Sequence, residues 1–511
     1  MSGQRVWTIT LAGLCLAGCM VGPDYRTPEI RTPDKYGSAH DHHNQPPPEA
    51  WWTVFGDPTL NRLIRDAAAS NLDIKQTAQR ILTARAERQR TIATGLPDIT
   101  ARANASQRHN DFITGSGGLT NPAAGGYFGN GLIDIIQAGF DVQWEIDPAG
   151  GLFRRIEAAE ANIEAEQNNR RAMLVSLLGE VARLYIDLRA NQAKMAVTLA
   201  NVKAQDDTLA LTTVRTRAGL ASEQEVTQQR AQVETTRAEL PAFEIAARQD
   251  AHALAVLLGK PPNTLLYLLD NTTGIPAAPP NVVADLPAEL LRRRPDILMA
   301  ERTLAAATAE VGAATAELYP KLNLTAFLGL QNTKLSDFSP IGKSWAMAGG
   351  ISTPIFNWGR IQASIDQANA QQEGAFLAYQ QSVLTALKEV EDALVAYQQE
   401  QSRRTSLQHS VTANQLAVTL SEERYLRGLT PFLNVLESQR SLYLSENSLI
   451  ASQARVSTSL VALYKALGGG WQAIEQAGAA PASAAADTLP PGTGAGTAAR
   501  PAPAAPSEAG P

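Results

Sequence analysis

Residues 174–259 align without a gap with residues 383–468, at an offset of 209 (383 − 174). Within both segments, apolar residues recur at alternating intervals of four and three positions, which is typical of one face of a long helix packed against others. The alignment also pairs Gly219 with Gly428. The pattern therefore predicts two copies of one helical unit.

Helix-forming residues continue without a proline over 152–217 and over 360–427, which are 66 and 68 residues long. At 1.5 Å per residue each helix would be about 100 Å long and would need lateral partners along its length. A turn and a returning helix follow each one. We expect the first return to begin at Ser222, through a capping box with Glu225, and the second at Thr430, just before a proline.

The hydrophobic period changes to two in four other segments, where apolar and polar side chains alternate as in strands with one apolar face. The alternating apolar residues are Ile99, Ala101, Ala103 and Ala105; Ile136, Ala138, Phe140, Val142, Trp144 and Ile146; Leu322, Leu324, Ala326, Leu328 and Leu330; and Trp345, Met347, Ile351 and Ile355. We therefore predict one β-hairpin in each half, over 97–147 and 320–356.

Four strands are too few to close a membrane barrel, because such barrels begin at about eight strands. Two chains would give a barrel that side chains fill, whereas three chains would leave room for a water-filled lumen. Alternation alone would also fit a soluble hairpin, and heptad spacing would also fit a coiled-coil stalk. We predict a mainly α protein with a membrane β-barrel, in which a homotrimer shares the barrel and packs its helices into a tube.

The first residues resemble a bacterial lipoprotein signal peptide. Arg5 precedes an apolar stretch that is too short to cross a bilayer as a permanent helix, and Leu16-Ala17-Gly18 precedes Cys19 as in a lipobox. Cys19 is therefore the predicted lipid attachment site, although a plain secretory signal would share the apolar stretch. Met20 follows instead of an acidic residue, which resembles lipoproteins that are delivered to the outer membrane.

These signals divide the chain into five segments. We predict a signal peptide over 1–18, a lipid-anchored tether over 19–57, a first repeat over 58–270, a second repeat over 271–470, and a disordered tail rich in Ala, Pro and Gly over 471–511. The turns of the two helical hairpins fall near 217–222 and 427–431.

The composition and the short motifs argue against nucleic-acid binding, metal binding and catalysis. With 44 Lys+Arg against 50 Asp+Glu, the net charge of −6 is mild and no basic block suggests nucleic acid. A lipidated Cys19 leaves no free thiol in the mature chain, and His40, His42 and His43 lie in a Pro-rich tether that better fits a solvated linker than a metal site. The chain lacks a nucleophile elbow, zinc-ligand spacing and a phosphate loop, so we expect no enzyme, cofactor or metal.

Short motifs follow one another from residue 16 to about residue 470. They are Gly22-Pro23-Asp24-Tyr25, Phe55-Gly56-Asp57-Pro58, the segment 254–262, the run 286–297 (LPAELLRRRPDI) continuing to Leu318-Tyr319-Pro320-Lys321, and Pro354-Ile355-Phe356 with Gly359-Arg360. Together they resemble the outer-membrane efflux lipoproteins of the TolC superfamily, specifically the NodT-type factors of RND pumps. One departure is Pro148-Ala149-Gly150 after Asp147, where the family has an aromatic residue and a glycine, and it affects a strand-to-helix hinge.

The resemblance implies a trimeric channel-tunnel with its barrel in the outer membrane and its helices in the periplasm. Such a duct is passive, and it serves a tripartite pump for drugs or other small toxic compounds. Its partners would be outer-membrane lipid, a periplasmic adaptor and an inner-membrane RND transporter, which supplies the energy. A channel for type I protein secretion and a structural lipoprotein without a pore are the alternatives.

The resemblance further implies that the hairpin turns dock onto the adaptor. On this chain the docking residues would be Arg217, Gly219, Leu220 and Ser222 in the first turn, and Arg427, Gly428, Leu429 and Thr430 in the second. A glycine permits the positive φ of a tight turn, and an exposed leucine beside it is available to a partner. A Gly-Leu pair would equally serve only to close a helical hairpin.

We expect the tunnel to close near these turns, where helices of three chains converge. The candidate gate residues are Leu420, Glu422, Glu423 and Tyr425. A threefold ring of carboxylates would attract cations and resist tight closure. Charged residues on helices usually face solvent, so these glutamates would equally fit an exposed surface.

Overall fold

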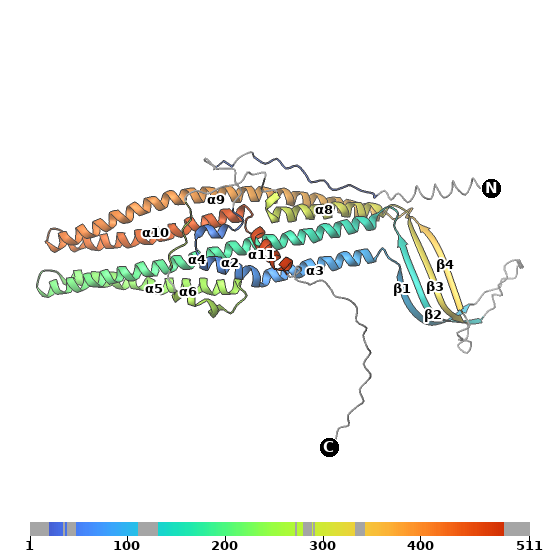
Figure 1. Cartoon of the computed structure of the whole chain (residues 1–511), viewed down its shortest axis with the longest axis horizontal. Helices are drawn as coiled ribbons and strands as arrows, with labels where there is room; N and C mark the ends of the chain where they lie inside the picture. Colours follow the sequence, from blue (N-terminus) through green and yellow to red (C-terminus); the bar gives the residue numbers. More distant parts are fainter. Residues whose placement is uncertain are drawn as a thin grey trace, which may run out of the picture.

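The computed structural model describes residues 20–33, 36–37, 48–110, 131–270, 273–279, 289, 292–332 and 343–484. Long helices run side by side, the sheet stands at one end, and the helical hairpins turn at the other end (Figure 1). The elements in chain order are η1 (Trp51–Phe55), α2 (Pro58–Ser70), α3 (Leu72–Ala93), β1 (Asp98–Asn110), β2 (Gly131–Ile146), α4 (Gly151–Arg217), α5 (Glu223–Leu257), η2 (Pro262–Leu265), α6 (Tyr267–Asp270), α8 (Pro295–Ala316), β3 (Lys321–Asn332), β4 (Lys343–Ser352), α9 (Arg360–Leu426), α10 (Phe432–Ala466) and α11 (Trp471–Ala484).

The two long helical hairpins repeat each other to the residue. Helices α4 and α9 both have 67 residues, α5 and α10 both have 35, and each bound in the second hairpin equals the first plus 209 (360 − 151 and 466 − 257). Gly150 and Gly359, which precede the long helices, have φ of 81° and 80°. A left-handed residue there lets the chain turn sharply into the helix. The predicted long helices and their duplication are confirmed.

The hinge at Gly150 forms despite the unusual residues before it. The backbone N–H of Ala149 donates to the Asp147 carboxylate at 3.0 Å, and the N–H of Gly150 lies 3.4 Å from the Asp147 carbonyl. Asp147 therefore stabilises the turn locally, so an aromatic residue is not required for this half to enter its helix.

All four strands form one antiparallel sheet in the order β1-β2-β3-β4. In its register Phe140 pairs with both Ala101 and Leu328, and Leu328 also pairs with Trp345. Side chains of directly paired residues lie on the same face of a sheet. The four predicted apolar series therefore share one face, as expected, although β4 ends at Ser352, earlier than the predicted 356.

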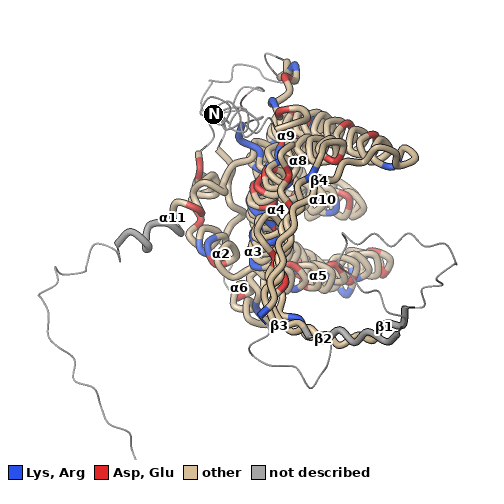
Figure 2. The backbone as a smooth tube through the Cα atoms, turned by 90° about the vertical axis from the view of Figure 1, so that its right-hand side faces the viewer, with Lys and Arg blue, Asp and Glu red and all other residues tan. Residues whose placement is uncertain are grey.

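No described part of the chain covers this apolar face. Phe140, Leu328 and Trp345 are 55%, 64% and 75% exposed. Charged residues are sparse along the strands compared with the helices (Figure 2). Strands β1 and β4 are the two edges of the sheet, so their outer backbone groups pair with no other strand among the described residues. Such a sheet is incomplete as a monomer.

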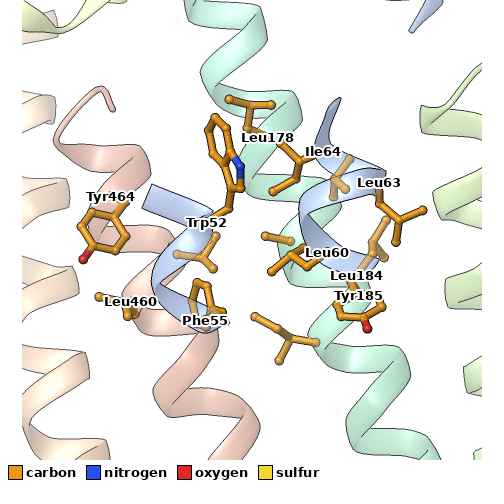
Figure 3. Close-up of a cluster of buried hydrophobic side chains, with 14 of the residues drawn as sticks. Trp52, Phe55, Leu60, Leu63, Ile64, Leu178, Leu184, Tyr185, Leu460 and Tyr464 are labelled. Atoms are coloured by element: carbon orange, nitrogen blue, oxygen red, sulfur yellow. The ribbon is translucent and has the colours of Figure 1, made fainter. Parts of the chain in front are cut away.

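The main core lies at the middle of the helices, where η1 and α2 insert between α4 and α10 (Figure 3). Leu60, Ile64 and Leu178 are fully buried there, and each contributes about 1.5–3 kcal/mol through burial. Trp51 stacks on Tyr464 with ring centroids 5.7 Å apart. Residues from the start of the chain thus join the first repeat to the second.

Two predicted segment boundaries need correction. The tail was predicted to be disordered from residue 471, but α11 occupies Trp471–Ala484. The Arg171 guanidinium lies 4.4 Å from the Trp471 ring centroid and pairs with Glu475 at 3.1 Å, and these contacts dock α11 on α4. Residues 485–511 lie outside the described part of the chain.

The tether is the second correction, because residues 20–27 pack on α4 and α8 rather than standing free. Their contacts involve buried partners, which a solvated linker would not require. Cys19 and the three tether histidines lie outside the residues that the structure describes. Among the described helices, none combines the length and apolar character needed to cross a membrane.

Candidate functional site: the hairpin tips

The first hairpin turn closes by backbone hydrogen bonds around Gly219, whose φ is 73°. The N–H of Leu220 donates to the Arg215 carbonyl at 2.8 Å, and the N–H of Gly219 donates to the Thr216 carbonyl at 3.0 Å. This is the usual way in which a left-handed glycine satisfies the last carbonyls of a helix. Ser222 then caps α5, with its hydroxyl 3.4 Å from the N–H of Glu225, as predicted.

The second turn repeats this geometry at Gly428, whose φ is 72°. The N–H of Leu429 donates to the Arg424 carbonyl at 2.9 Å. The predicted cap differs, because Pro431 rather than Thr430 occupies the N-cap position of α10 and makes no side-chain cap bond. The Thr430 hydroxyl instead accepts a hydrogen bond from the Asn434 amide at 2.5 Å.

Both turns expose a leucine and an arginine. Leu220 is 67% exposed and Leu429 is 64% exposed, and Arg217 and Arg427 are also exposed. The two turns therefore present the same apolar and cationic pair from equivalent backbones. Such a surface suits a partner that offers both an apolar contact and carboxylates.

Just above the turns, Tyr425 joins the second hairpin to the first. Tyr425 is 8% exposed, and its ring packs against Phe432 at an interplanar angle of 60°. Its hydroxyl donates to Glu225 Oε2 at 2.6 Å, and the Arg215 guanidinium lies 4.9 Å from the ring centroid. Burial, and then the neighbouring Glu225 carboxylate, raise the pKa of Tyr425 to about 12. We name the set Arg215, Glu225 and Tyr425 the tip latch.

The other candidate gate residues lie in different surroundings. Glu422 is half-buried and accepts a hydrogen bond from the Gln439 amide at 3.0 Å. Glu423 is exposed, with a carboxylate oxygen 3.8 Å from the Arg427 guanidinium, and Leu420 is 50% exposed. Leu420 and Glu423 are thus the two most exposed of the four candidate gate residues, and Glu422 is partly accessible. Tyr425 is buried between the two hairpins.

Polar side chains are buried between the helices on the way to the tips. Gln205 and Gln229 are 1% and 0% exposed, and the Gln229 amide donates to the Gln205 carbonyl at 2.9 Å. The Gln439 amide also donates to Thr208 at 3.0 Å. Sequence reasoning missed these residues, because glutamine and threonine on a helix usually indicate a solvated face.

A model of the outer membrane efflux protein family matches residues 63–260 and 286–469. The chain belongs to the outer membrane efflux protein family. Nodulation protein T of Rhizobium leguminosarum bv. viciae is 31% identical over 474 residues, which cover 93% of this chain and 95% of that protein. The probable efflux pump outer membrane protein TtgC of Pseudomonas putida is 30% identical and covers 95% of this chain and 99% of its own length.

Solved structures show the same fold. The outer-membrane channel OprN superposes with a TM-score of 0.81 at 32% identity, covering 89% of this chain and all of that one. The outer-membrane channel MtrE of Neisseria gonorrhoeae in its open state superposes with a TM-score of 0.76 at 26% identity, covering 89% of this chain and 99% of that one. The predicted trimeric TolC-like channel fold and the function as an outer-membrane efflux channel are confirmed.

Membership in the outer membrane efflux protein family explains the incomplete sheet, because three copies can join edge strand β4 of one chain to edge strand β1 of the next. The family is one of channel proteins rather than enzymes. It also places the chain in the outer membrane.

The family motif around Arg294 has a structural explanation in this efflux protein. Arg294 is 6% exposed and forms ion pairs with Asp296 at 2.6 Å and Glu389 at 2.7 Å, and it donates to the Ala466 carbonyl at 2.9 Å. It therefore joins the start of α8 to α9 and to the end of α10. The sequence showed the motif, including Asp296, but not the distant partners Glu389 and Ala466, which are 95 and 172 residues away.

Proposed function

We propose that this protein is the passive exit duct of a tripartite efflux pump, open to small toxic compounds, with an adaptor and an RND transporter as its partners. The observation behind the proposal is the arrangement of one sheet with an uncovered apolar face at one end and two matched hairpin turns at the other. Relatives are named for toluene, solvents, antibiotics and pyoverdine. This range supports a duct that leaves the choice of compound to the pump.

The first test is conductance of the purified trimer in planar bilayers. Discrete openings are the expected result, with the trimer mass measured on the same sample. A trimer that never conducts, even with an adaptor present, would favour a structural lipoprotein. Secretion of a protein, rather than of small compounds, by cells that depend on this channel would favour the type I alternative.

We propose that the two turns dock the adaptor through Leu220 and Leu429, flanked by Arg217 and Arg427. Their exposure and their equivalent backbones support this role. The test compares Leu220→Ser and Leu429→Ser with Leu72→Ser, a control leucine that is 58% exposed at the start of α3. We expect the tip variants to lose adaptor binding and pump-dependent resistance while the trimer still conducts. Equal behaviour of all three variants would rule out docking by these leucines.

The glycines of the turns, together with Ser222 and Thr430, would position these leucines. Gly219 and Gly428 hold the left-handed turns, Ser222 caps α5, and Thr430 holds Asn434. Substituting Thr430→Val should therefore weaken adaptor binding less than Leu429→Ser, since it removes a supporting contact only. A larger effect of the valine would assign the contact to Thr430.

We propose that the closed state is held by the tip latch, while Leu420, Glu422 and Glu423 line the narrowed passage. The latch crosses between the hairpins, and Glu423 and Leu420 are exposed above the turn. Replacing Glu423 by Gln should reduce cation preference, because a neutral ring attracts cations less. An unchanged reversal potential in a salt gradient would remove Glu423 from the passage.

We also propose that Cys19 carries the lipid anchor. The lipobox supports this assignment. Cells fed labelled palmitate should label the wild-type protein and not Cys19→Ser. Labelling that persists in the serine variant would refute the site.

A further inference from the structure

The chain passes from sheet to helix at two equivalent hinges, which differ in what covers them. The first hinge, residues 144–151, joins β2 to α4, and the second hinge, residues 353–360 at the offset of 209, joins β4 to α9. A Cβ added to Gly150 would lie 3.1 Å from Met20, whereas one added to Gly359 would meet nothing within 4 Å. Among the described residues, the second hinge therefore lacks the cover that the first one has.

The second hinge also carries large apolar side chains that the first lacks. The offset pairs Phe356 with Asp147 and Trp358 with Ala149. Phe356 and Trp358 are 73% and 89% exposed, their ring centroids lie 4.7 Å apart, and Ile355 is 93% exposed. Trp358 is the one described non-glycine residue with a positive φ, of 55°, which is uncommon outside glycine. An exposed apolar cluster of this kind marks a contact surface.

The first hinge shows what such a segment packs against. A Cβ added to Gly151 would lie 2.7 Å from the Cβ of Ala316, at the end of α8. Ala149 is only 7% exposed, and Ile146 pairs with Leu322 of β3. The first hinge is therefore packed against the corner at which α8 leads into β3.

The chain has an equivalent corner where α3 leads into β1. Helix α3 ends at Ala93 and β1 begins at Asp98, each 223 residues before the end of α8 and the start of β3 (316 − 93 and 321 − 98). We name residues 90–99 the α3–β1 corner. The start of β1 and the end of β4 both lie at the helical end of the sheet, and both strands are edges (Figure 1). When three copies close the barrel, the second hinge of one chain therefore comes beside the α3–β1 corner of the next.

The α3–β1 corner offers exposed apolar side chains and room beside them. Leu96 and Ile99 are 59% and 65% exposed. A cavity of about 890 Å³ adjoins them, lined by Arg90, Leu96 and Asp98 and by residues of β2 and β3 that include Gln143. The corner can therefore receive large apolar side chains from a neighbouring chain.

The repeat also gives a register between neighbouring chains. The pair Ile146–Leu322 becomes Ile355 of one chain opposite Ile99 of the next when the two offsets are applied (146 + 209 and 322 − 223). Within the single chain β4 ends at Ser352, so residues 353–355 would gain a partner strand only from the next copy. The two most exposed isoleucines at this end of the sheet would then cover each other.

The same register directs Phe356 into the cavity. Successive side chains of a strand point to opposite faces, so Phe356 lies on the face opposite Ile355. Asp98 likewise lies on the face opposite Ile99, and it pairs directly with Gln143. Both Asp98 and Gln143 line the cavity, which is therefore on the face to which Phe356 points.

We propose that the second hinge docks on the α3–β1 corner of the neighbouring copy, with Ile355 opposite Ile99 and the rings of Phe356 and Trp358 packed against the end of α3. The partner is a second copy of this chain. The proposal goes beyond the efflux duct proposed above, since it assigns the residues that join the barrel of one chain to the helices of the next.

Disulfide cross-linking of the full-length trimer tests the register. Arg360 and Ala93 are the equivalents of Gly151 and Ala316, which are adjacent at the first hinge. The double variant Arg360→Cys with Ala93→Cys, oxidised in membranes with copper phenanthroline, should give covalent trimers on denaturing gels. The control pairs Arg360→Cys with Leu82→Cys, since Leu82 is on the same side of α3 but eleven residues, about 16 Å, earlier. Wild type and the single variants measure any background from other cysteines.

Dissociation of the trimer in detergent tests the rings. We expect Phe356→Ser and Trp358→Ser each to speed dissociation into monomers at least tenfold. The matched control is Phe153→Ser, which removes an aromatic side chain that is 61% exposed beside the first hinge. Dissociation at the control rate in both hinge variants would overturn docking by the rings and assign them to the bilayer.

Cross-linking decides the proposal if a serine variant does not assemble, because Arg360 and Ala93 are both exposed in the single chain. Equal cross-linking of the test and control pairs, or of neither, would overturn the register. Neither readout depends on conductance, so a trimer that never conducts would refute the duct and leave this proposal to its own result.

Discussion

Replacing Tyr425 by phenylalanine tests whether the tip latch holds the channel closed. The substitution removes one hydroxyl and keeps the ring between Phe432 and the Arg215 guanidinium. What is lost is the 2.6 Å hydrogen bond to the Glu225 carboxylate. Because Glu225 is on α5 and Tyr425 is on α9, only the contact between the hairpins changes.

The size of the effect follows from the kind of hydrogen bond. A bond to a charged group is worth about 1.5–3 kcal/mol, and the lower value applies here because water can reach the half-buried Glu225. About 1.5 kcal/mol corresponds to roughly a tenfold shift between closed and open states in each chain. If three chains open together, the shift in the trimer would approach about a thousandfold.

The latch should not respond to pH in the ordinary range. The pKa of Tyr425 is raised, so the protonated donor is favoured, and its contribution is complete below about pH 10 and is lost only as the pH rises through about 12. Any pH dependence of opening between pH 6 and 8 must therefore come from other groups.

The measurement is single-channel open probability in planar bilayers. Tyr443→Phe is the control. The Tyr443 hydroxyl lies 3.3 Å from the Thr198 hydroxyl and also joins the two hairpins, but it lies twelve residues after Pro431, about 18 Å along the helix from the turn. We expect Tyr425→Phe to open more often and the control to match wild type. If both variants match wild type, the latch does not limit opening.

Three further outcomes follow from the structure. Burial raises the pKa of Asp250 to about 6, and the neighbouring Asp187 adds to the rise. The ionised Asp250 carboxylate therefore destabilises the fold as the pH rises through about 6. Asp250→Asn should raise the unfolding temperature at pH 8 and leave it unchanged at pH 4. Arg294→Met should lower the free energy of unfolding by about 2 kcal/mol, because water can solvate the two carboxylate partners but not the Ala466 carbonyl. The control Arg292→Met, at an exposed position, should change it by less than about 0.5 kcal/mol. Gly219→Ala should destabilise the tip by about 1 kcal/mol in hydrogen exchange, whereas Gly374→Ala inside α9 should stabilise its helix by about 0.5–1 kcal/mol.

Regular periodicity made the helices and the sheet predictable. The offset of 209 and the alternation around Phe140 predicted both hairpins and the apolar face, because these patterns depend on spacing within a segment. The turns were predictable from Gly219 and Gly428 for the same reason. The cap at Thr430 was the exception, since Pro431 occupies the N-cap position of α10 and makes no side-chain cap bond.

Contacts between distant segments could not be predicted in this way. In the sequence, Arg154 is one charge among many on α4, whereas in the structure its buried guanidinium pairs with Asp24, which lies 130 residues earlier in the chain. The position of Tyr425 near the turn made it a candidate gate residue, but its hydrogen-bond partner Glu225 lies 200 residues away and had no signal in the sequence. Local pattern sets which face of a helix is apolar, but it does not identify the residue opposite.

The internal duplication does not reproduce the tip latch, because the equivalent positions in the other hairpin carry different residues. Adding or subtracting 209 pairs Tyr425 with Thr216 and Glu225 with Asn434. Thr216 already donates to the Thr212 carbonyl, and Asn434 to Thr430, so each is satisfied within its own hairpin. If the hairpins of neighbouring chains pack as the two hairpins of one chain do, Thr216 of one chain would face Asn434 of the next. The contact between chains would then lack the tyrosine–carboxylate hydrogen bond that joins the hairpins within a chain.

Building the missing contact is therefore the complementary experiment. The double variant Thr216→Tyr with Asn434→Glu should place the same tyrosine–carboxylate pair between neighbouring chains, and its open probability should fall below that of wild type. The single variants are the controls, since neither supplies both partners. A double variant that opens as often as wild type would show that hairpin contacts at this level do not set the closed state, whereas a fall that Tyr425→Phe reverses would show that both kinds of interface act on one gate.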